Sequence, residues 1–302
     1  MSGPHGVLIV DKPRGPTSHD IVASARRLFR TRQVGHAGTL DPMATGVMVL
    51  LFGEATKLSG HMTRHDKAYE ATVGFGAETD TLDAEGSVIR SAELDSNWLT
   101  ASRLEQALGA ELERTTQVPP AFSAVRVGGR RAHRLSRRGE AVHLEPRSVH
   151  VAELRLLEWS STRARLQLVV SKGYYVRALA RDLGERLGVP AQLTELRRTA
   201  SGAFSLDEAV VWPPSTPPPL IPLGEVARRQ FPCSQLTRTG IERARHGQLL
   251  AGDHFATAPE GASDDESTAP PTLAWLDEHD ELVALGVERE PGTYAVIRGF
   301  RC

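Results

Sequence analysis

The 302-residue sequence contains little of what several common classes of protein require. Its two cysteines, Cys233 and Cys302, allow at most one disulfide, and neither belongs to a CxxC pair that would bind zinc or carry out redox chemistry. We expect both to be reduced and uninvolved in function. The apolar run from Val7 to Val10 is too short for a signal peptide or a membrane span, so we expect a cytoplasmic protein without a membrane segment.

Motifs for bound nucleotides and metal ions are incomplete. Gly74 and Gly76 follow a predicted strand, but Thr79 stands where a dinucleotide-binding GxGxxG fingerprint needs its third glycine. Asp83 opens a stretch similar to part of a calcium loop, but the position of the bidentate glutamate is Ala92. Walker A, HExxH and GxSxG motifs are also absent from the sequence. We therefore expect no metal ion and no cofactor.

The charge is small in total and uneven along the chain. A formal net charge of -1 argues against a protein that coats nucleic acid indiscriminately. Between residues 121 and 150, however, only Glu140 and Glu145 accompany seven arginines: Arg126, Arg130, Arg131, Arg134, Arg137, Arg138 and Arg147. Such a cluster forms either a stripe that contacts phosphates or an ordinary solvated surface.

Hydrophobic periodicity predicts both helices and strands. Apolar residues at helical spacing indicate an amphipathic helix that begins after a cap at Thr17 or Ser18 and reaches Phe29. Alternation over residues 69–75 is typical of a half-buried strand, with Tyr69 on its interior side.

A second strand, at 166–170, leads through Gly173 into a helix at 176–187. Because strands and helices do not alternate as regular βαβ units, we expect an α+β fold with a mixed sheet.

The length favours about two domains. The prolines of 213–219 favour a stiff, extended segment, after which the composition changes. An acidic stretch between residues 252 and 271 precedes two short strand-like runs, which is typical of a small β-rich module with one long loop. We predict domains at 1–228 and 229–302.

One loop has an unusual composition. Residues 35–46, GHAGTLDPMATG, contain three glycines and a proline, with Asp41 next to Pro42 and His36 five positions earlier. An aspartate in this setting commonly forms an Asx turn, and the loop alone does not separate that structural role from a catalytic one.

The same loop is one of several motifs that occur in a recognisable order. In chain order these are residues 10–18, 35–46, 67–70, 79–86, 119–124, 171–177 and 196–198. Together they resemble the motifs of the bacterial tRNA pseudouridine-55 synthases, over about residues 6–205. The resemblance implies a mixed, largely antiparallel central sheet with flanking helices, the pseudouridine synthase fold, and a small C-terminal PUA-like domain that binds RNA.

The resemblance also implies an activity. Members of the family isomerise uridine to pseudouridine at position 55, in the T-loop of tRNA, without a cofactor or an obligate protein partner. Asp41 corresponds to the catalytic carboxylate and Arg177 to the cation beside it. Tyr175 is the expected functional tyrosine because of its spacing from Arg177, while Tyr174 replaces a threonine of the relatives. In extended backbone, Tyr175 and Arg177 would face the same side.

The remaining expected site residues bind the substrate. Tyr69 is expected to stack on the extruded uracil, and Leu196 to close the opposite side or simply to pack in the core. His36 corresponds to the histidine that contacts the loop when the base leaves. Lys12 either contacts a phosphate or holds the loop of Asp41. Five arginines of the basic cluster are expected to contact the backbone of the T-arm: Arg130, Arg131, Arg134, Arg137 and Arg138.

Three other functions remain open. The chain could modify a different RNA with the help of a guide and partner proteins, or bind RNA without catalysis. A metabolic enzyme acting on free nucleotides is the third, although no phosphate-cradling loop supports it. We take a monomer as the default.

Overall fold

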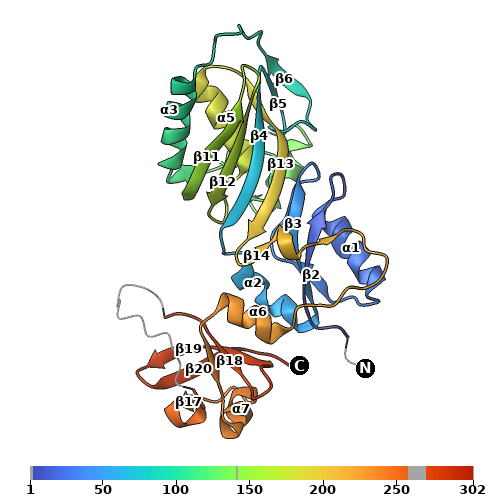
Figure 1. Ribbon diagram of the computed structural model, residues 1–302, viewed down its shortest axis with the longest axis vertical. Helices are drawn as coiled ribbons and strands as arrows, with labels where there is room; N and C mark the ends of the chain where they lie inside the picture. The colour runs from blue at the N-terminus through green and yellow to red at the C-terminus, as the bar shows by residue number, and fades with distance from the viewer. Residues whose placement is uncertain (1–2, 141, 258–269, 302) are drawn as a thin grey trace.

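The computed structural model describes residues 3–140, 142–257 and 270–301, and its main feature is a nine-stranded sheet. The strands are β1 Gly6–Lys12, β2 Val34–His36, β3 Thr45–Phe52, β4 Lys67–Phe75, β11 Val151–Trp159, β12 Arg163–Val170, β13 Ala191–Ser201, β14 Phe204–Ser205 and β15 Val210–Val211. The order is β11-β12-β4-β13-β3-β1-β15, with β14 beside β13 and β2 beside β3. Figure 1 labels the part from β11 to β3. Only β1–β15 and β13–β3 pair in parallel among these described strands, so the expected mixed, largely antiparallel sheet is confirmed.

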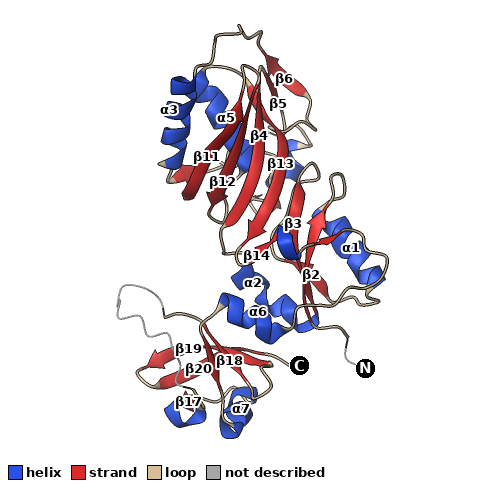
Figure 2. Cartoon of the chain, in the orientation of Figure 1, coloured by secondary structure: helices blue, strands red, loops and turns tan. Residues whose placement is uncertain are grey.

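Helices flank this sheet (Figure 2). They are α1 Ser18–Leu28, α2 Ser59–Met62, α3 Ala101–Leu112, α5 Val176–Leu187 and α6 Leu223–Gln230, with 3-10 turns at Gly53–Leu58 and Leu206–Glu208. Leu8 and Val10 of β1 enter a core shared with α1, α3 and α5, whereas Val7 and Ile9 enter a second core shared with α6. Because successive strand residues point to opposite faces, β1 is buried on both sides. Within the described residues, every helix is too short or too polar to traverse a lipid bilayer.

Several predicted elements lie where the sequence placed them. Thr17, one of the two candidate caps, is the N-cap of α1 and forms a capping box with Asp20. Tyr69 lies on β4, partly buried against the first core, as expected. Strand β12 leads through a turn at Gly173, with φ 90°, into α5. The helix predicted at 176–187 is confirmed as α5, and Arg177 lies in its first turn, directly after the N-cap Tyr175. The extended backbone considered for Arg177 is therefore wrong.

A second, five-stranded sheet follows α6 and packs below the first in Figure 1. Its strands are β16 Cys233–Gln235, β17 Leu250–Ala251, β18 Leu273–Leu276, β19 Leu282–Glu290 and β20 Thr293–Gly299, with α7 Arg238–Arg245 and a 3-10 turn at Gly252–His254. The expected β-rich module is therefore present. The predicted boundary between 228 and 229 falls inside α6, and the division into domains stays a prediction. Most of the acidic stretch, residues 258–269, lies outside the described residues.

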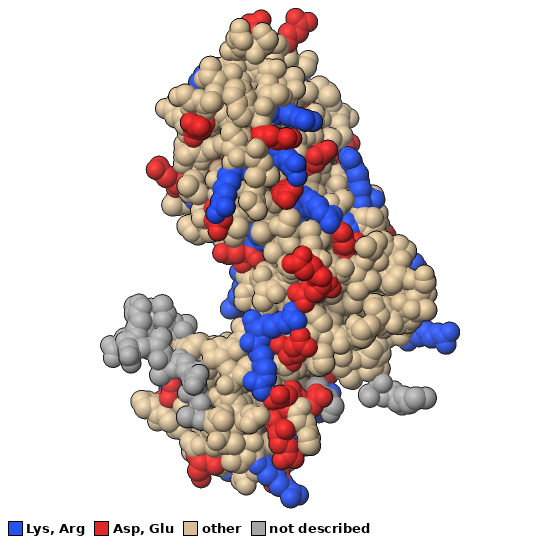
Figure 3. All heavy atoms as spheres, in the orientation of Figure 1, with Lys and Arg blue, Asp and Glu red and all other residues tan. Residues whose placement is uncertain are grey.

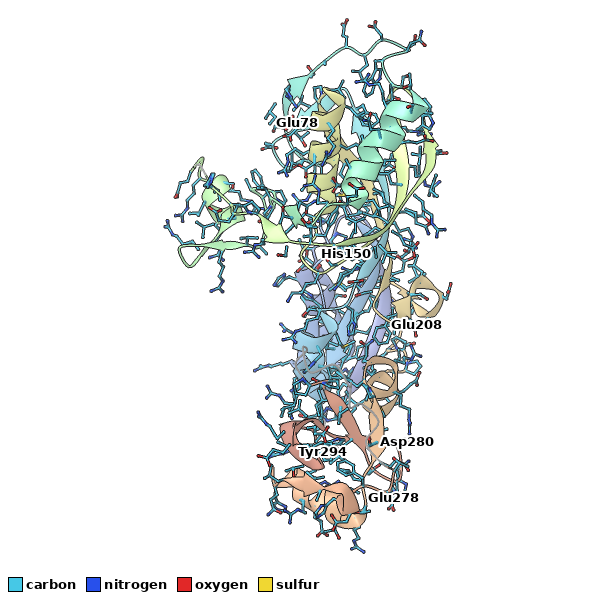
Figure 4. The ribbon with its side chains drawn as sticks, turned by 90° about the vertical axis from the view of Figure 1, so that its left-hand side faces the viewer. Glu78, His150, Glu208, Glu278, Asp280 and Tyr294 are labelled. Atoms are coloured by element: carbon cyan, nitrogen blue, oxygen red, sulfur yellow. The ribbon has the colours of Figure 1, made fainter. Side chains whose placement is uncertain are left out.

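Residues 121–140 and 142–147 form an arm that projects from the body in Figure 4, and His150 is labelled near its root. At the root, β7 Thr116–Gln117 pairs with β10 Arg147–Ser148. The arm contains β8 Arg126–Val127, β9 Arg130–Arg131 and α4 Ala132–Ser136, and a separate hairpin is formed by β5 Ala77–Thr79 and β6 Val88–Ser91. A small core of its own, centred on Val125, Ala132 and Leu144, holds the arm together, and Tyr175 packs against this core.

Replacing glycine with alanine should have opposite effects on the free energy of unfolding at two helical positions. A Cβ on Gly224 in α6 would overlap the carbonyl oxygen of Asp280, in the turn between β18 and β19, whereas a Cβ on Gly109 in α3 would meet nothing within 4 Å. We expect Gly224→Ala to lower the free energy of unfolding by about 1–3 kcal/mol, the usual cost of overpacking. Gly109→Ala, the matched control, should raise it by about 0.5–1 kcal/mol. Urea unfolding measures both, and equal effects would contradict the close packing of α6 on the second sheet.

Candidate active site

Asp41 lies in the loop between β2 and β3, where the sequence predicted it. The backbone N–H of Ala44 donates to the Asp41 carbonyl at 3.1 Å, and the N–H of Gly15 donates to the Pro42 carbonyl at 2.9 Å. The Asp41 side chain is 33% exposed. A fixed backbone thus presents a carboxylate that a bound molecule can reach.

Lys12 lies beneath this loop and is fully buried. Its Nζ donates to the carbonyls of Pro13 at 2.9 Å, Pro42 at 3.2 Å and Ala44 at 2.7 Å. Burial lowers the pKa of Lys12 to about 8, so the ammonium is still protonated at neutral pH and its three donors match these three acceptors. Of the two roles considered for Lys12, the geometry favours holding the Asp41 loop over contacting a phosphate.

Arg198 of β13 fixes the same loop from another side. Its Nε donates to the Val47 carbonyl at 2.6 Å, Nη2 to the Gly38 carbonyl at 3.2 Å and Nη1 to the Thr39 carbonyl at 3.4 Å. Gly46 has φ 102°, and a Cβ there would overlap the Arg198 backbone. Glycine is therefore required where the loop enters β3.

Arg177 contacts Asp41 directly and is 7% exposed. Its Nε lies 2.9 Å from Asp41 Oδ2, and Nη2 donates to Asp41 Oδ1 at 3.2 Å. The other guanidinium contacts are with the carbonyls of Thr81 at 2.9 Å and Phe122 at 3.0 Å, and with Asp83 Oδ2 at 3.6 Å. One guanidinium thus lies between two carboxylates and joins three segments that are distant in sequence.

Asp83 is the second carboxylate beside Arg177 and is also 7% exposed. The Thr81 hydroxyl donates to Asp83 Oδ1 at 2.7 Å, and the Glu85 N–H donates to the same oxygen at 3.1 Å. Because its oxygens are engaged inside the protein, Asp83 orients Arg177, while the more exposed Asp41 faces outward.

Tyr175 lies next to this pair, at the N-cap of α5. Burial raises the pKa of Tyr175, with opposing contributions from Ser123, Arg147 and Arg177 nearby, so the phenol is protonated at neutral pH. Tyr174 points elsewhere: its hydroxyl donates to the buried carboxylate of Glu111 at 2.8 Å. The geometry therefore agrees with the choice of Tyr175 over Tyr174.

Tyr69 and Leu196 lie on one face of the sheet. Tyr69 of β4 is opposite Arg198, and Leu196 of β13 is opposite Ala71, so the tyrosine and the leucine are diagonal neighbours. Leu196 is 8% exposed and belongs to the first core, against which Tyr69 packs. Arg198 in turn links this face to the loop of Asp41.

His36 ends β2, at the start of the loop, and its ring lies edge-on to His19 with centroids 5.9 Å apart. Burial, together with the charges of His19 and Arg198, lowers the pKa of His36, so the imidazole is neutral at neutral pH. His36 is thus placed to donate or accept a hydrogen bond without carrying charge.

The arginine cluster lies on the arm. Arg126, Arg130, Arg134 and Arg138, with Gly129 and Leu135, line a hollow of about 410 Å³. Arg137 is also exposed, and the side chain of Arg131 lies outside the described residues. Arg130 lies 3.8 Å from Glu140. On the face shown in Figure 3, by contrast, basic and acidic side chains are interspersed.

Some contributors to the site did not stand out in the sequence. Asp83 and Arg198 lie in segments that resemble family motifs, but their contacts depend on chain pairing that no local pattern encodes. Gln117, which bonds the Tyr175 backbone, carries no local signal at all.

The assembled site can act on a planar substrate that presents an electrophilic carbon or an acidic proton. Asp41 supplies a carboxylate that can serve as nucleophile or base, and Arg177 supplies a fixed positive charge beside it. Tyr69 supplies an aromatic ring on the neighbouring strand. The structure thus combines the groups expected of an enzyme that acts on a nucleobase.

Sequence comparisons agree with this class of enzyme. The family model described as "TruB family pseudouridylate synthase (N terminal domain)" matches residues 26–176, and that of the "tRNA pseudouridylate synthase B C-terminal domain" matches residues 177–212. The chain is 44% identical to tRNA pseudouridine synthase B of Mycobacterium sp. (strain KMS), over 85% of this chain and 90% of the relative. The chain is 47% identical to tRNA pseudouridine synthase B of Mycobacterium bovis (strain BCG / Pasteur 1173P2), over 69% of this chain and 70% of the relative. The chain belongs to the TruB family of pseudouridylate synthases.

Solved structures agree on the fold. A chain of "Crystal Structure of a Cbf5-Nop10-Gar1 Complex" aligns with a TM-score of 0.72 at 24% identity, over 98% of this chain and 84% of that one. A chain of "Structure of H/ACA RNP bound to a substrate RNA containing 2'-deoxyuridine" aligns with a TM-score of 0.72 at 22% identity, over 99% and 86%. Both alignments extend over the second sheet, which lies beyond the residues matched by the family models.

Proposed function

We propose that this chain isomerises uridine to pseudouridine at position 55, in the T-loop of tRNA, with Asp41 as the catalytic carboxylate. The observation that carries the proposal is the contact between Asp41 and Arg177 at the exposed end of a rigidly held loop. The tRNA substrate is supported by the names of the relatives, which cover most of the chain at 44–47% identity.

The reaction breaks the bond between ribose C1' and N1 of uracil, turns the base, joins C1' to C5 and removes the C5 proton. These changes need no redox equivalent and no phosphate energy. Asp41 acts by attacking the base or C1', or by assisting glycosidic cleavage and accepting a proton. Each of these roles requires a carboxylate held at the base, and the two contacts with Arg177 fix the orientation of the Asp41 carboxylate.

A base within a folded T-loop must be extruded before Asp41 can reach it, at a cost of a few kcal/mol. Stacking on an aromatic ring returns about 1–3 kcal/mol. Tyr69 offers that ring, Leu196 closes the other side, and Tyr175 completes the aromatic wall beside Arg177. His36 contacts the RNA loop from which the base departs.

The arm binds the T-arm backbone through Arg130, Arg131, Arg134, Arg137 and Arg138, and the C-terminal domain, residues 229–302, is PUA-like and adds RNA contacts. A monomer in the cytoplasm, acting without an obligate protein partner, is sufficient for this reaction. The hollow among the exposed arginines, about 410 Å³, supports the phosphate contacts.

Tritium release tests the proposal directly. An unmodified tRNA transcript labelled at uridine C5 should release tritium with the wild-type protein alone, and no release should follow when the T-loop uridine is replaced by cytidine. Asp41→Asn should lower the rate by about 10²–10⁴-fold, because the carboxylate that carries the chemistry is removed. Asp95→Asn, an exposed carboxylate in a distant loop, is the control and should retain the rate. Release from the cytidine transcript would contradict the T-loop target, and full activity of Asp41→Asn would contradict the role of Asp41.

If the arm arginines contact phosphates, removing them should change the salt dependence of tRNA binding. Replacing Arg130, Arg134 and Arg138 with glutamine should weaken tRNA binding and reduce the slope of log K against log salt by roughly 0.7–0.9 for each phosphate that the arm no longer neutralises. The single-turnover rate at saturating enzyme should persist, since the arginines do not touch Asp41. A filter-binding titration across salt concentrations measures the slope.

The control replaces three arginines that lie away from the arm and are paired with carboxylates: Arg90, Arg155 and Arg163. An unchanged slope in the arm variant, or an equal change in the control, would assign the arm arginines to ordinary solvated surface.

A further inference from the structure

The N-terminus of α5, which carries Arg177, lacks a capping side chain of its own. Its N-cap residue is Tyr175, which makes no side-chain hydrogen bond to the helix. In a capping box, the third helical residue accepts a hydrogen bond from the N-cap N–H, but in α5 this residue is Ala178 and has no acceptor. The order of this helix end therefore depends on groups from elsewhere in the chain.

Gln117 of β7 supplies the missing acceptor from 58 residues away. Its Oε1 accepts from the Tyr175 N–H at 2.8 Å, and its Nε2 donates to the Tyr175 carbonyl at 3.2 Å. Gln117 is 2% exposed, so water does not compete strongly for these bonds. The two bonds fix the Tyr175 backbone in both position and rotation.

The neighbours of Gln117 tie the same segment to the same helix. The Val118 carbonyl accepts from Arg181 Nη2 at 3.0 Å, and the Phe122 carbonyl accepts from Arg177 Nη2 at 3.0 Å. The backbone of Gln117 also pairs with Arg147 at the root of the arm. Segment 117–122 thus forms a strap that is bound at three points to the first two turns of α5.

We propose that Gln117 is a positioning residue for the reaction: it caps α5 in place of a local side chain and holds Tyr175 and Arg177 against Asp41. The inference rests on the function proposed above. A misplacement of about 1 Å at reacting groups costs on the order of 10²-fold in rate, so a residue that sets the start of α5 controls the rate without touching the substrate.

The test separates positioning from general packing with variants of Gln117 and a neighbouring control. Gln117→Met keeps the approximate shape and removes both hydrogen bonds, while Gln117→Glu keeps the acceptor and sets a carboxylate against the Tyr175 carbonyl. The control is Tyr174→Phe, one position before Tyr175, which removes the buried hydrogen bond from the Tyr174 hydroxyl to Glu111. Glu111 remains bonded to Arg114 Nε at 2.6 Å, so that control keeps its buried carboxylate paired.

Single-turnover tritium release at saturating enzyme gives the rate, filter binding gives the Kd for tRNA, and circular dichroism verifies the fold. We expect Gln117→Met to lower the rate by about 10²-fold with an unchanged Kd, and Tyr174→Phe to keep the wild-type rate. If Gln117→Met does not fold, a folded Gln117→Glu variant gives the same comparison and should also be slow.

The results distinguish a failure of the positioning role of Gln117 from a failure of the proposed function. A wild-type rate in a folded Gln117 variant would overturn the positioning role alone, as would an equal loss in Tyr174→Phe, which would mean general loosening. A change confined to Kd would overturn it too, by assigning Gln117 to RNA binding. No tritium release by the wild-type protein would overturn the proposed function and this inference with it.

Discussion

The ion pair between Asp41 and Arg177 is the interaction on which the rest of the site depends. Arg177 is almost entirely buried, and a buried charge is costly unless it is paired and hydrogen-bonded. The protein meets this requirement with two carboxylates and two backbone carbonyls around one guanidinium. Since those acceptors come from three segments, the pair also brings the catalytic loop, the 79–86 loop and the root of the arm together.

A second constraint is that the loop of Asp41 must be held rigidly while the Asp41 side chain stays exposed. Lys12 and Arg198 are buried cations whose hydrogen bonds go to loop carbonyls and leave the Asp41 carboxylate uncovered. Lys12 holds the carbonyls of Pro42 and Ala44, and Arg198 holds those of Gly38 and Thr39, so the backbone is fixed on both sides of Asp41. The loop is thus held by buried groups, while the Asp41 side chain stays accessible to a substrate.

The sequence was sufficient wherever a local pattern carried the information. The cap of α1, the strand of Tyr69, the turn at Gly173 and the loop of Asp41 were all predicted, because periodicity, glycine and capping chemistry act over a few residues. Long-range partners were not predictable in this way: the family resemblance named Arg177 as the cation beside Asp41, but not its contacts with Thr81, Asp83 and Phe122. The bond from Gln117 to Tyr175 was invisible because it links residues 58 positions apart. Lys12 remained ambiguous until its three carbonyl acceptors were located.

The most direct measurement is the single-turnover rate of Arg177→Lys on a tRNA transcript, with Arg186→Lys, an exposed position on the same helix, as its control. The substitution keeps the positive charge, but one ammonium cannot bond both Asp41 oxygens and also reach two carbonyls. The account predicts a rate loss on the order of 10²-fold for Arg177→Lys and none for Arg186→Lys. A wild-type rate in a folded Arg177→Lys protein would contradict it, because charge alone would then be sufficient and the geometry of the pair would not matter.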